Sequence, residues 1–190
     1  MVEASASPPT MNAERPRSPH GDAPLTPALF RKVMGRFATG VTVVTTRVDD
    51  EVFGMTANAF LAGSLSPALC AISIARAAKM HLHLEAAGCF GISFLSEEQV
   101  HLSQHFAGRK AVGVEPTFRR LGGIPVLNGG VGAVAAEIAD TANCGDHTLF
   151  IGRITALEAA EHRPLLFYSG RYATLDREQR FEDLGRQSFW

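Results

Sequence analysis

The sequence predicts a mainly β protein whose antiparallel strands form a barrel with short α-helices at its side. Three observations predict it. Segments rich in Val, Thr and Ile alternate with turn residues, helical segments are few and short, and strands and helices lack the regular alternation of a parallel sheet. With 190 residues, of which 46% are hydrophobic, the chain is long enough for one domain with a sizeable core.

The domain limits follow from composition. Residues 1–24 hold five prolines among Ser, Ala and charged residues, and we expect a disordered N-terminal tail there. The folded domain is expected over 25–178, with a C-terminal tail at 179–190.

The domain is expected to begin with a helix. Thr26 is typical of an N-cap, and Pro27 of the first helical position. Leu29, Val33 and Phe37 then share one face of the helix. We expect that face to pack on the sheet.

A β pattern starts after Gly40. Residues 41–48 and 52–60 are expected to form a hairpin across the Asp49-Asp50-Glu51 turn. A further strand is predicted over 68–74, with alternate residues such as Ile72 facing the core and Ser73 on the opposite side. The neighbouring inward positions are Cys70 and Ile74.

The later elements follow from the same signals. Helices are expected over 79–87 and from Ser96 towards Phe106, whereas 108–128 carries many turn formers and is interpreted as a surface excursion. The remaining predicted strands are 89–95, 131–139, 147–159, 164–168 and 171–175.

The totals exclude several classes of partner. Basic and acidic residues nearly cancel, at 18 against 19, so we expect neither a nucleic-acid nor a membrane partner. Three widely spaced cysteines, Cys70, Cys89 and Cys144, fit neither a disulfide framework nor a zinc knuckle, and a reducing cytoplasm is the expected location. We also find no apolar run of the roughly 20 residues that a membrane span needs, and no signal peptide.

The most informative stretch runs from Gly54 to Pro67 and reads GMTANAFLAGSLSP. It combines small residues and hydroxyls with one amide, at a point where a strand is expected to give way to a loop. Such a composition can direct backbone N–H groups and side-chain donors at a phosphate or at the edge of a heterocycle. An ordinary strand end is the alternative interpretation of this run taken alone.

Several segments together resemble the flavin reductase family, over about residues 25 to 176. In chain order they are Phe37–Val41, Gly54–Asn58, Ser64–Pro67, Phe106-Ala107, Gly145–His147 and Pro164–Tyr172. The resemblance implies an antiparallel Greek-key split barrel, the FMN-binding split barrel. It also implies hydride transfer from NADH or NADPH to FMN or FAD, a homodimer with the flavin near the subunit junction, and a separate monooxygenase that receives the reduced flavin.

The resemblance also implies roles for individual residues. Thr56, Ala57 and Asn58 look like the run that holds the isoalloxazine edge, and Ser64 with Leu65 would reach the ring or the ribityl chain. Ser73 and the turn from Arg76 to Lys79 resemble the phosphate-binding corner, although Ala77 and Ala78 stand where the family often has hydroxyl residues. The further cofactor-binding positions that the resemblance implies are Phe106, Ala107 and Tyr172.

His147 resembles the family's histidine near the nicotinamide and flavin rings. The alternative is a structural donor at a strand start. We expect it to bind and orient the dinucleotide, because hydride transfer between two cofactor rings needs alignment more than a protein acid or base.

Two other motifs are weighed and set aside. The run from Gly130 to Ala135 satisfies G-x-G-x-x-A, but Phe150 stands where an acidic residue is needed and the chain cannot complete a doubly wound sheet. His101 and His105 are spaced for zinc, yet no third ligand is evident, and Cys144 with His147 is likewise a two-ligand fragment. We therefore expect no metal.

The sequence leaves two alternative functions open. One is a flavoprotein that holds FMN for electron carriage, storage or sensing without turning over NAD(P)H, and the other is the reductase half of a different oxidase or oxidoreductase built on the same barrel. One barrel hosts several activities, so fold alone does not separate them.

Overall fold

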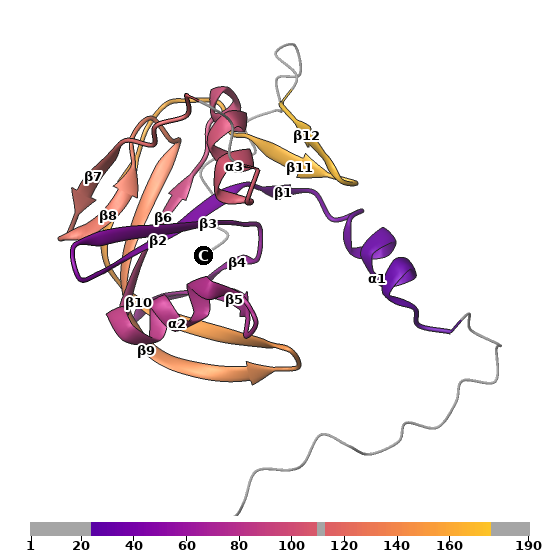
Figure 1. Ribbon diagram of the computed structural model, residues 1–190, viewed down its shortest axis with the longest axis horizontal. Coiled ribbons are helices and arrows are strands. Elements are labelled where there is room, and N and C mark those ends of the chain that lie inside the picture. Colours follow the sequence, from indigo (N-terminus) through magenta and orange to yellow (C-terminus); the bar gives the residue numbers. More distant parts are fainter. Residues whose placement is uncertain (1–23, 110–112, 176–190) are drawn as a thin grey trace, which may run out of the picture.

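Seven strands form one antiparallel sheet that curves into the wall of a barrel (Figure 1). The computed structural model describes residues 24–109 and 113–175. The seven strands are β2 (Thr42–Val48), β3 (Glu51–Ala57), β4 (Phe60–Leu65), β5 (Ala68–Ala75), β6 (Cys89–Phe94), β9 (Gly132–Cys144) and β10 (His147–Ala159). Their order across the sheet is β3-β2-β6-β9-β10-β5-β4, and every neighbouring pair is antiparallel. The predicted mainly β, antiparallel fold is confirmed.

The remaining strands form two smaller sheets. β1 (Thr39–Gly40) pairs with β11 (Leu166–Tyr168). β11 also pairs with β12 (Arg171–Ala173), which confirms the last predicted hairpin. β7 (Phe118–Leu121) pairs with β8 (Ile124–Leu127).

The interpretation of 108–128 as a surface excursion was wrong for β8, because all four of its residues are buried. Leu127 N–H donates to Ser93 Oγ at 2.8 Å, and Thr45 Oγ1 donates to the Pro125 carbonyl, so β8 packs against the sheet. Four apolar residues between turn formers are too short a run to stand out in the sequence.

The hairpin of β2 and β3 forms as predicted, with Asp49 and Asp50 at positive φ in its turn. The predicted strand 52–60, however, ends at Ala57. Phe60 begins β4, which pairs with β5. The sequence analysis missed β4 because its residues Ala62 and Gly63 have low β-propensity.

The helices are short. They are α1 (Pro27–Met34), α2 (Lys79–Ala87), the 3₁₀ turn η1 (Glu97–Gln99) and α3 (Val100–Phe106). Thr26 caps α1 as predicted, since its side chain accepts a hydrogen bond from Leu29 N–H at 3.1 Å. None of the helices in the described part of the chain is long and apolar enough to cross a bilayer.

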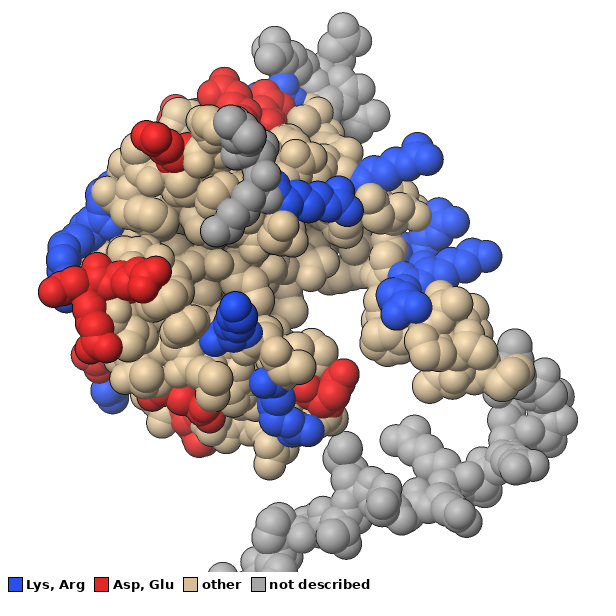
Figure 2. All heavy atoms as spheres, viewed as in Figure 1, with Lys and Arg blue, Asp and Glu red and all other residues tan. Residues whose placement is uncertain are grey.

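The expectation that α1 packs on the sheet was wrong. No residue of α1 is buried, and the helix lies apart from the barrel with basic side chains around it (Figures 1 and 2). Val33 is 51% exposed, and Phe37, which lies beyond the end of the helix, is 77% exposed. The apolar face predicted from the spacing therefore exists, but this chain does not cover it.

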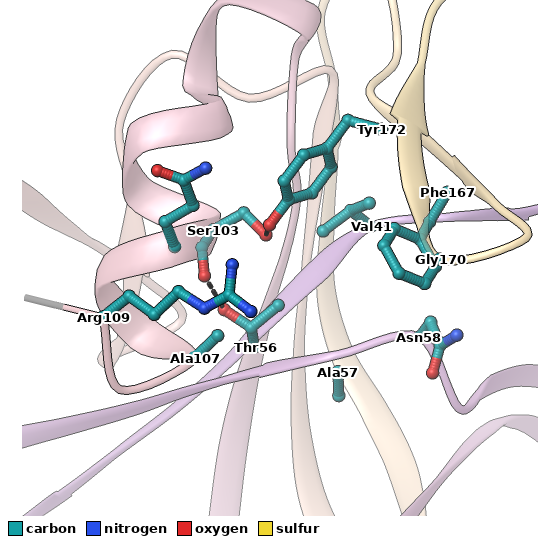
Figure 3. Close-up of a pocket in the computed structure, with 11 residues that line it drawn as sticks. Val41, Thr56, Ala57, Asn58, Ser103, Ala107, Arg109, Phe167, Gly170 and Tyr172 are labelled. Carbon is teal, nitrogen blue, oxygen red and sulfur yellow. Dashed lines mark hydrogen bonds between the residues drawn. The ribbon is translucent and has the colours of Figure 1, made fainter.

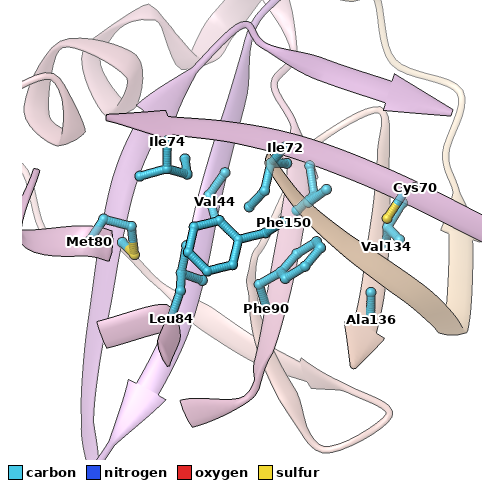
Figure 4. Packing of buried hydrophobic residues seen from close by; sticks show 11 residues of the cluster. Val44, Cys70, Ile72, Ile74, Met80, Leu84, Phe90, Val134, Ala136 and Phe150 are labelled. Carbon is cyan, nitrogen blue, oxygen red and sulfur yellow. The ribbon is translucent and has the colours of Figure 1, made fainter. Parts of the chain in front are cut away.

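The main core lies inside the barrel, where residues from both ends of the sheet meet (Figure 4). Phe90, Phe150 and Leu84 are fully buried there. The predicted inward positions are confirmed, because Cys70 and its neighbours at alternate positions are buried whereas Ser73 is only half-buried. Burial raises the pKa of the Cys70 thiol to about 11.

A second core cluster holds α3 against the outside of the sheet. Leu102 of α3 packs with Val43, Leu95 and Leu127. The helix entry is fixed by a capping box, in which Ser96 N–H donates to the Gln99 side chain at 3.0 Å. α3 is thereby positioned beside β3.

Gly91 marks a close approach of β6 to β8. A Cβ at this position would lie 2.8 Å from Thr45 Oγ1 and would collide with the Pro125 carbonyl oxygen, which cannot rotate away. We expect Gly91→Ala to lower the free energy of unfolding by about 3 kcal/mol, and Tm by roughly 6–12 °C, in thermal denaturation. Gly40→Ala is the control, since its Cβ would meet nothing within 4 Å; equal Tm values for the two variants would contradict this packing.

Candidate functional site

A hollow of about 330 Å³ opens where β3 ends, between α3 and the β11–β12 hairpin (Figure 3). We call it the cradle. Its lining residues are Val41, Thr56, Ala57, Asn58, Ser103, Gln104, Ala107, Arg109, Phe167, Gly170 and Tyr172.

Hydrogen bonds tie the three walls of the cradle together. Thr56 Oγ1 donates to the Ser103 carbonyl at 2.7 Å, which joins β3 to α3. The Ser103 hydroxyl lies 2.9 Å from the Tyr172 hydroxyl, which joins α3 to β12. The cradle is therefore a preformed pocket that spans three elements distant in sequence.

The polar groups that remain free in the cradle suit the edge of a heterocycle. The Asn58 amide is exposed and Arg109 points from the end of α3 towards Thr56 (Figure 3). Among the described residues, neither side chain has a hydrogen-bond partner or an ion pair. Ala57 and Phe167 supply apolar surface beside them. A flat ring with polar oxygen and nitrogen atoms on one edge fits this donor set.

His147 lies in a different hollow, between α1 and the start of β10. Ser73 and Asp146 line the same hollow. His147 Nδ1 lies 2.8 Å from Asp146 Oδ1, and because a carboxylate only accepts, Nδ1–H is the donor. This hydrogen bond from His147 lowers the pKa of Asp146 below its ordinary value of 3.8. The imidazole is thus oriented, with Nε2 left for a ligand.

The turn between β9 and β10 is fastened to the start of α2. Arg76 N–H donates to the Asp146 carbonyl at 3.1 Å, and its guanidinium donates to the Gly145 carbonyl. His81 Nε2 lies 2.8 Å from Thr148 Oγ1, one residue after His147. The Arg76 side chain therefore holds the His147 turn in place.

The start of α2 is open to an anion. Its N-cap is Ala78, which provides no side-chain hydrogen bond. His81 N–H donates to the Ala78 carbonyl at 3.0 Å, so the N–H groups of Lys79 and Met80 are the ones left without a cap. Lys79, the first helical residue, is exposed and adds a positive charge. These groups fit a phosphate even without the hydroxyls of the family pattern.

The structure brings together about half of the predicted site residues. Those in the cradle are Thr56, Ala57, Asn58, Ala107 and Tyr172.

The other predicted residues lie elsewhere. Ser73 and His147 share the second hollow, and Lys79 and Phe106 line a groove between α2 and α3. Phe106 packs directly on Gly54, where a Cβ would come within 2.5 Å of its ring. Ser64 and Leu65 lie at the end of β4 and do not line the cradle.

Six lining residues of the cradle were not among the predicted site residues: Val41, Ser103, Gln104, Arg109, Phe167 and Gly170. Ser103 could have been predicted, because a helix that runs to Phe106 places Ser103 one turn before Ala107 and on the same face of the helix. Arg109 follows the helix and carried no such signal.

The histidine pair of α3 has no third potential metal ligand beside it in the described part of the chain. His101 is exposed, and its Nδ1 lies 3.1 Å from the Glu98 carbonyl of the preceding turn. Within residues 24–109 and 113–175, no three His, Cys, Asp or Glu side chains gather as metal ligands.

The Asp146–His147 contact predicts a measurable coupling. In His147→Ala we expect the Asp146 pKa to rise towards 3.8, because the hydrogen bond that lowers it is lost. Carbon-13 NMR of the side-chain carboxyl over pH 2 to 6 measures this. His162→Ala, an exposed histidine outside the hollow, should leave the Asp146 titration unchanged. An Asp146 pKa equal in His147→Ala and the wild type would refute the contact.

Known proteins share this architecture over most of the chain. The model of the flavin reductase like domain matches residues 34–176. An NADH-dependent flavin reductase of a Rhodococcus species is 40% identical over 172 residues, which cover 89% of this chain and 94% of that protein. The reductase component of 4-hydroxyphenylacetate 3-monooxygenase from Thermus thermophilus is 37% identical over 142 residues, covering 75% and 91%.

A solved structure agrees with these relatives. Flavin reductase PheA2 in its native state superposes with a TM-score of 0.79 at 42% sequence identity, covering 80% of this chain and 100% of that one. The family model's match, over residues 34–176, extends from the last residue of α1 past β12, so it includes the cradle and the His147 turn. The chain therefore belongs to the family of flavin reductase-like domains.

Proposed function

We propose that this chain is an NADH-dependent flavin reductase that binds the flavin ring in the cradle. The observation that carries the proposal is the cradle itself, which places a free amide and a free guanidinium beside apolar surface at the end of β3. The relatives named as NADH-dependent flavin reductase and as a monooxygenase reductase component support an enzyme over the non-catalytic flavoprotein.

The chain's own residues bind and orient, and the flavin and the dinucleotide supply the redox chemistry. Asn58 and Arg109 hold the polar edge of the ring, while Ala57 and Phe167 contact its faces. The hydrogen bonds between Thr56, Ser103 and Tyr172 keep these groups in position. A preformed geometry of this kind lowers the cost of aligning two ring systems.

His147 orients the reduced dinucleotide. Its Nδ1–H is held by Asp146, which leaves Nε2 directed to a ligand amide or hydroxyl. Ser73 lies in the same hollow, and Lys79 with the open start of α2 binds phosphate. FMN and FAD both present a phosphate to this corner.

The chain acts with other protein subunits. We propose a homodimer, supported by the exposed apolar face of α1, where Phe30 and Met34 are each 53% exposed. A separate monooxygenase component receives the reduced flavin, as the name of the Thermus relative suggests.

Anaerobic stopped-flow spectroscopy tests the activity. The purified protein is mixed with free FMN or FAD and then with NADH or NADPH, and loss of flavin absorbance near 450 nm is followed. Bleaching much faster than in the protein-free mixture supports the reductase, most strongly with NADH. Bleaching no faster than that mixture excludes the reductase, and a stoichiometric yellow protein inert to both donors would support the non-catalytic flavoprotein.

The cradle predicts a defect specific to flavin. We expect Asn58→Leu to raise the Kd for flavin about tenfold, because an apolar side chain leaves the polar ring edge without a partner. Fluorescence titration measures Kd, and Tm should stay close to the wild type since Asn58 is exposed. Asn143→Leu, an exposed amide in β9 outside the cradle, is the matched control. Unchanged affinity in Asn58→Leu would reduce the run to an ordinary strand end.

The His147 hollow predicts the complementary defect. We expect His147→Ala to raise the KM for NADH about tenfold while the KM for flavin changes less than twofold, because the side chain contacts only the dinucleotide. Steady-state kinetics with each substrate varied in turn provide the measurement, with His101→Ala as the control histidine. An equal effect on both substrates would assign His147 a structural role.

A further inference from the structure

Basic side chains gather around the openings of the cradle and of the His147 hollow. Figure 2 shows Lys and Arg side chains around α1 and beside the opening between α1 and the barrel, whereas the Asp and Glu side chains lie mainly on the side away from α1. Four exposed residues that belong to α1, follow its C-cap or begin β12 form what we call the basic rim: Arg31, Lys32, Arg36 and Arg171. Arg31 also lines the His147 hollow.

The two parts of the basic rim are joined to one another. Ser169 N–H, in the turn of the β11–β12 hairpin, donates to the Gly35 carbonyl at the end of α1 at 2.7 Å. The Arg36 guanidinium donates to the Tyr168 hydroxyl at 3.2 Å. Since the same hairpin forms one wall of the cradle, a ligand that enters the cradle does so beside the basic rim.

The charges of the basic rim are not neutralised by neighbours. Among the residues that the structure describes, none of the four has an ion pair with a carboxylate. The arginines that do have one lie elsewhere on the barrel: Arg47 with Asp50, Arg119 with Glu158, Arg153 with Glu137, and Arg163 with Glu97. Because paired charges cancel at a distance, the unpaired ones determine the electric field outside the protein.

Acidic side chains are almost absent from the same surface. Asp146 is the one acidic residue of the described chain that lines the cradle or the His147 hollow. Three more cations lie further in, and within the described structure they also lack ion pairs: Arg76, Lys79 and Arg109. The net charge of −1 therefore hides a separation of charge, with the positive side at the two openings.

Helix stability explains only part of the basic rim. Arg31 and Lys32 lie in the last turn of α1, where cations interact favourably with the helix dipole. The first turn of α1, however, has no acidic residue, although a negative charge there would be equally favourable. Arg171 lies on a strand and gains nothing from that dipole. What the four residues share is their charge and their place at the openings.

We propose that the basic rim attracts phosphate-bearing redox nucleotides from solution and directs them into the cradle and the His147 hollow. The inference rests on the proposed reductase function. FMN, FAD and NADH all carry anionic phosphate groups, whereas riboflavin has the same ring as FMN and no phosphate. The basic rim should act on the association rate constant, because long-range attraction speeds the encounter while exposed charges add little to the bound complex.

The salt dependence of association tests the attraction. Stopped-flow quenching of flavin fluorescence measures the association rate constant kon without any redox reaction. We expect kon for FMN to fall about tenfold between about 0.01 M and about 0.15 M salt, because the Debye length shortens from about 30 Å to about 8 Å. For riboflavin, kon should change less than about twofold over the same range, because it carries no charge to attract.

A charge-removing variant assigns the effect to the basic rim. We expect Arg31→Gln/Lys32→Gln/Arg171→Gln to bind FMN with a kon about fivefold lower at about 0.01 M salt, while koff changes less than about twofold. Its kcat at saturating FMN and NADH should equal that of the wild type. Arg171→Gln alone lies off α1, so a smaller decrease of kon in this variant keeps the result independent of how the helix packs.

The matched control removes the same charge from another surface. Arg47→Gln/Arg119→Gln/Arg120→Gln alters residues of β2 and β7 that line neither the cradle nor the His147 hollow. Its kon for FMN should lie within about twofold of the wild type, because net charge alone does not place a field at the openings.

Three results would overturn the inference: an unchanged kon in the rim variant, an equal decrease in the control, or equal salt dependence for FMN and riboflavin. An unchanged kon would leave an acidic protein surface as the occupant of the basic rim. Reduction of FMN by NADH separates this failure from a failure of the proposed function. If FMN is reduced and the rim variant binds it as fast as the wild type, only the rim assignment is lost; if FMN is not reduced, the reductase assignment itself is wrong.

Discussion

The position of the cradle depends on β3 and β4, two strands that follow one another in the chain but lie at opposite ends of the sheet. Among the residues that the structure describes, β3 pairs only with β2 and β4 pairs only with β5, and the connection between β3 and β4 is Asn58 and Ala59. The barrel is therefore joined at this point by the covalent chain and not by a ladder of hydrogen bonds. Backbone and side-chain groups at the junction stay free for a ligand, which is why the cradle lies there.

The long β9–β10 hairpin makes this separation possible. Each of its strands has 13 residues; β9 pairs with β6 and β10 with β5, so the hairpin lies between the two halves of the sheet. The turn of the same hairpin carries His147 and is fastened to α2 by Arg76. One element thus sets both the opening of the barrel and the position of the His147 turn relative to it.

The sequence correctly predicted the elements that depend on neighbouring residues in the chain, such as helix caps and alternating apolar positions. The bounds of α2, the cap at Thr26 and the inward side of β5 depend on caps and alternation, and they agree with the structure. β4 was missed because its small residues gain their strand conformation from pairing with β5. The packing of α1 was wrong because spacing reveals an apolar face but not its partner.

The candidate site was predictable where one segment carries it, as in the run from Thr56 to Asn58. Ser103 and Arg109 join that run only through the packing of α3 beside β3, which no local pattern encodes. His147 was predicted as a site residue, yet its separation from the cradle follows from strand order alone.

The buried thiol of Cys70 has a chemical consequence for a protein of this kind. Free reduced flavin that meets dioxygen yields hydrogen peroxide, and peroxide attacks the thiolate form of cysteine. With a pKa of about 11, roughly one Cys70 in 10,000 is ionised at neutral pH. Burial thus keeps Cys70 in the thiol form, which reacts slowly with the peroxide that reduced flavin generates.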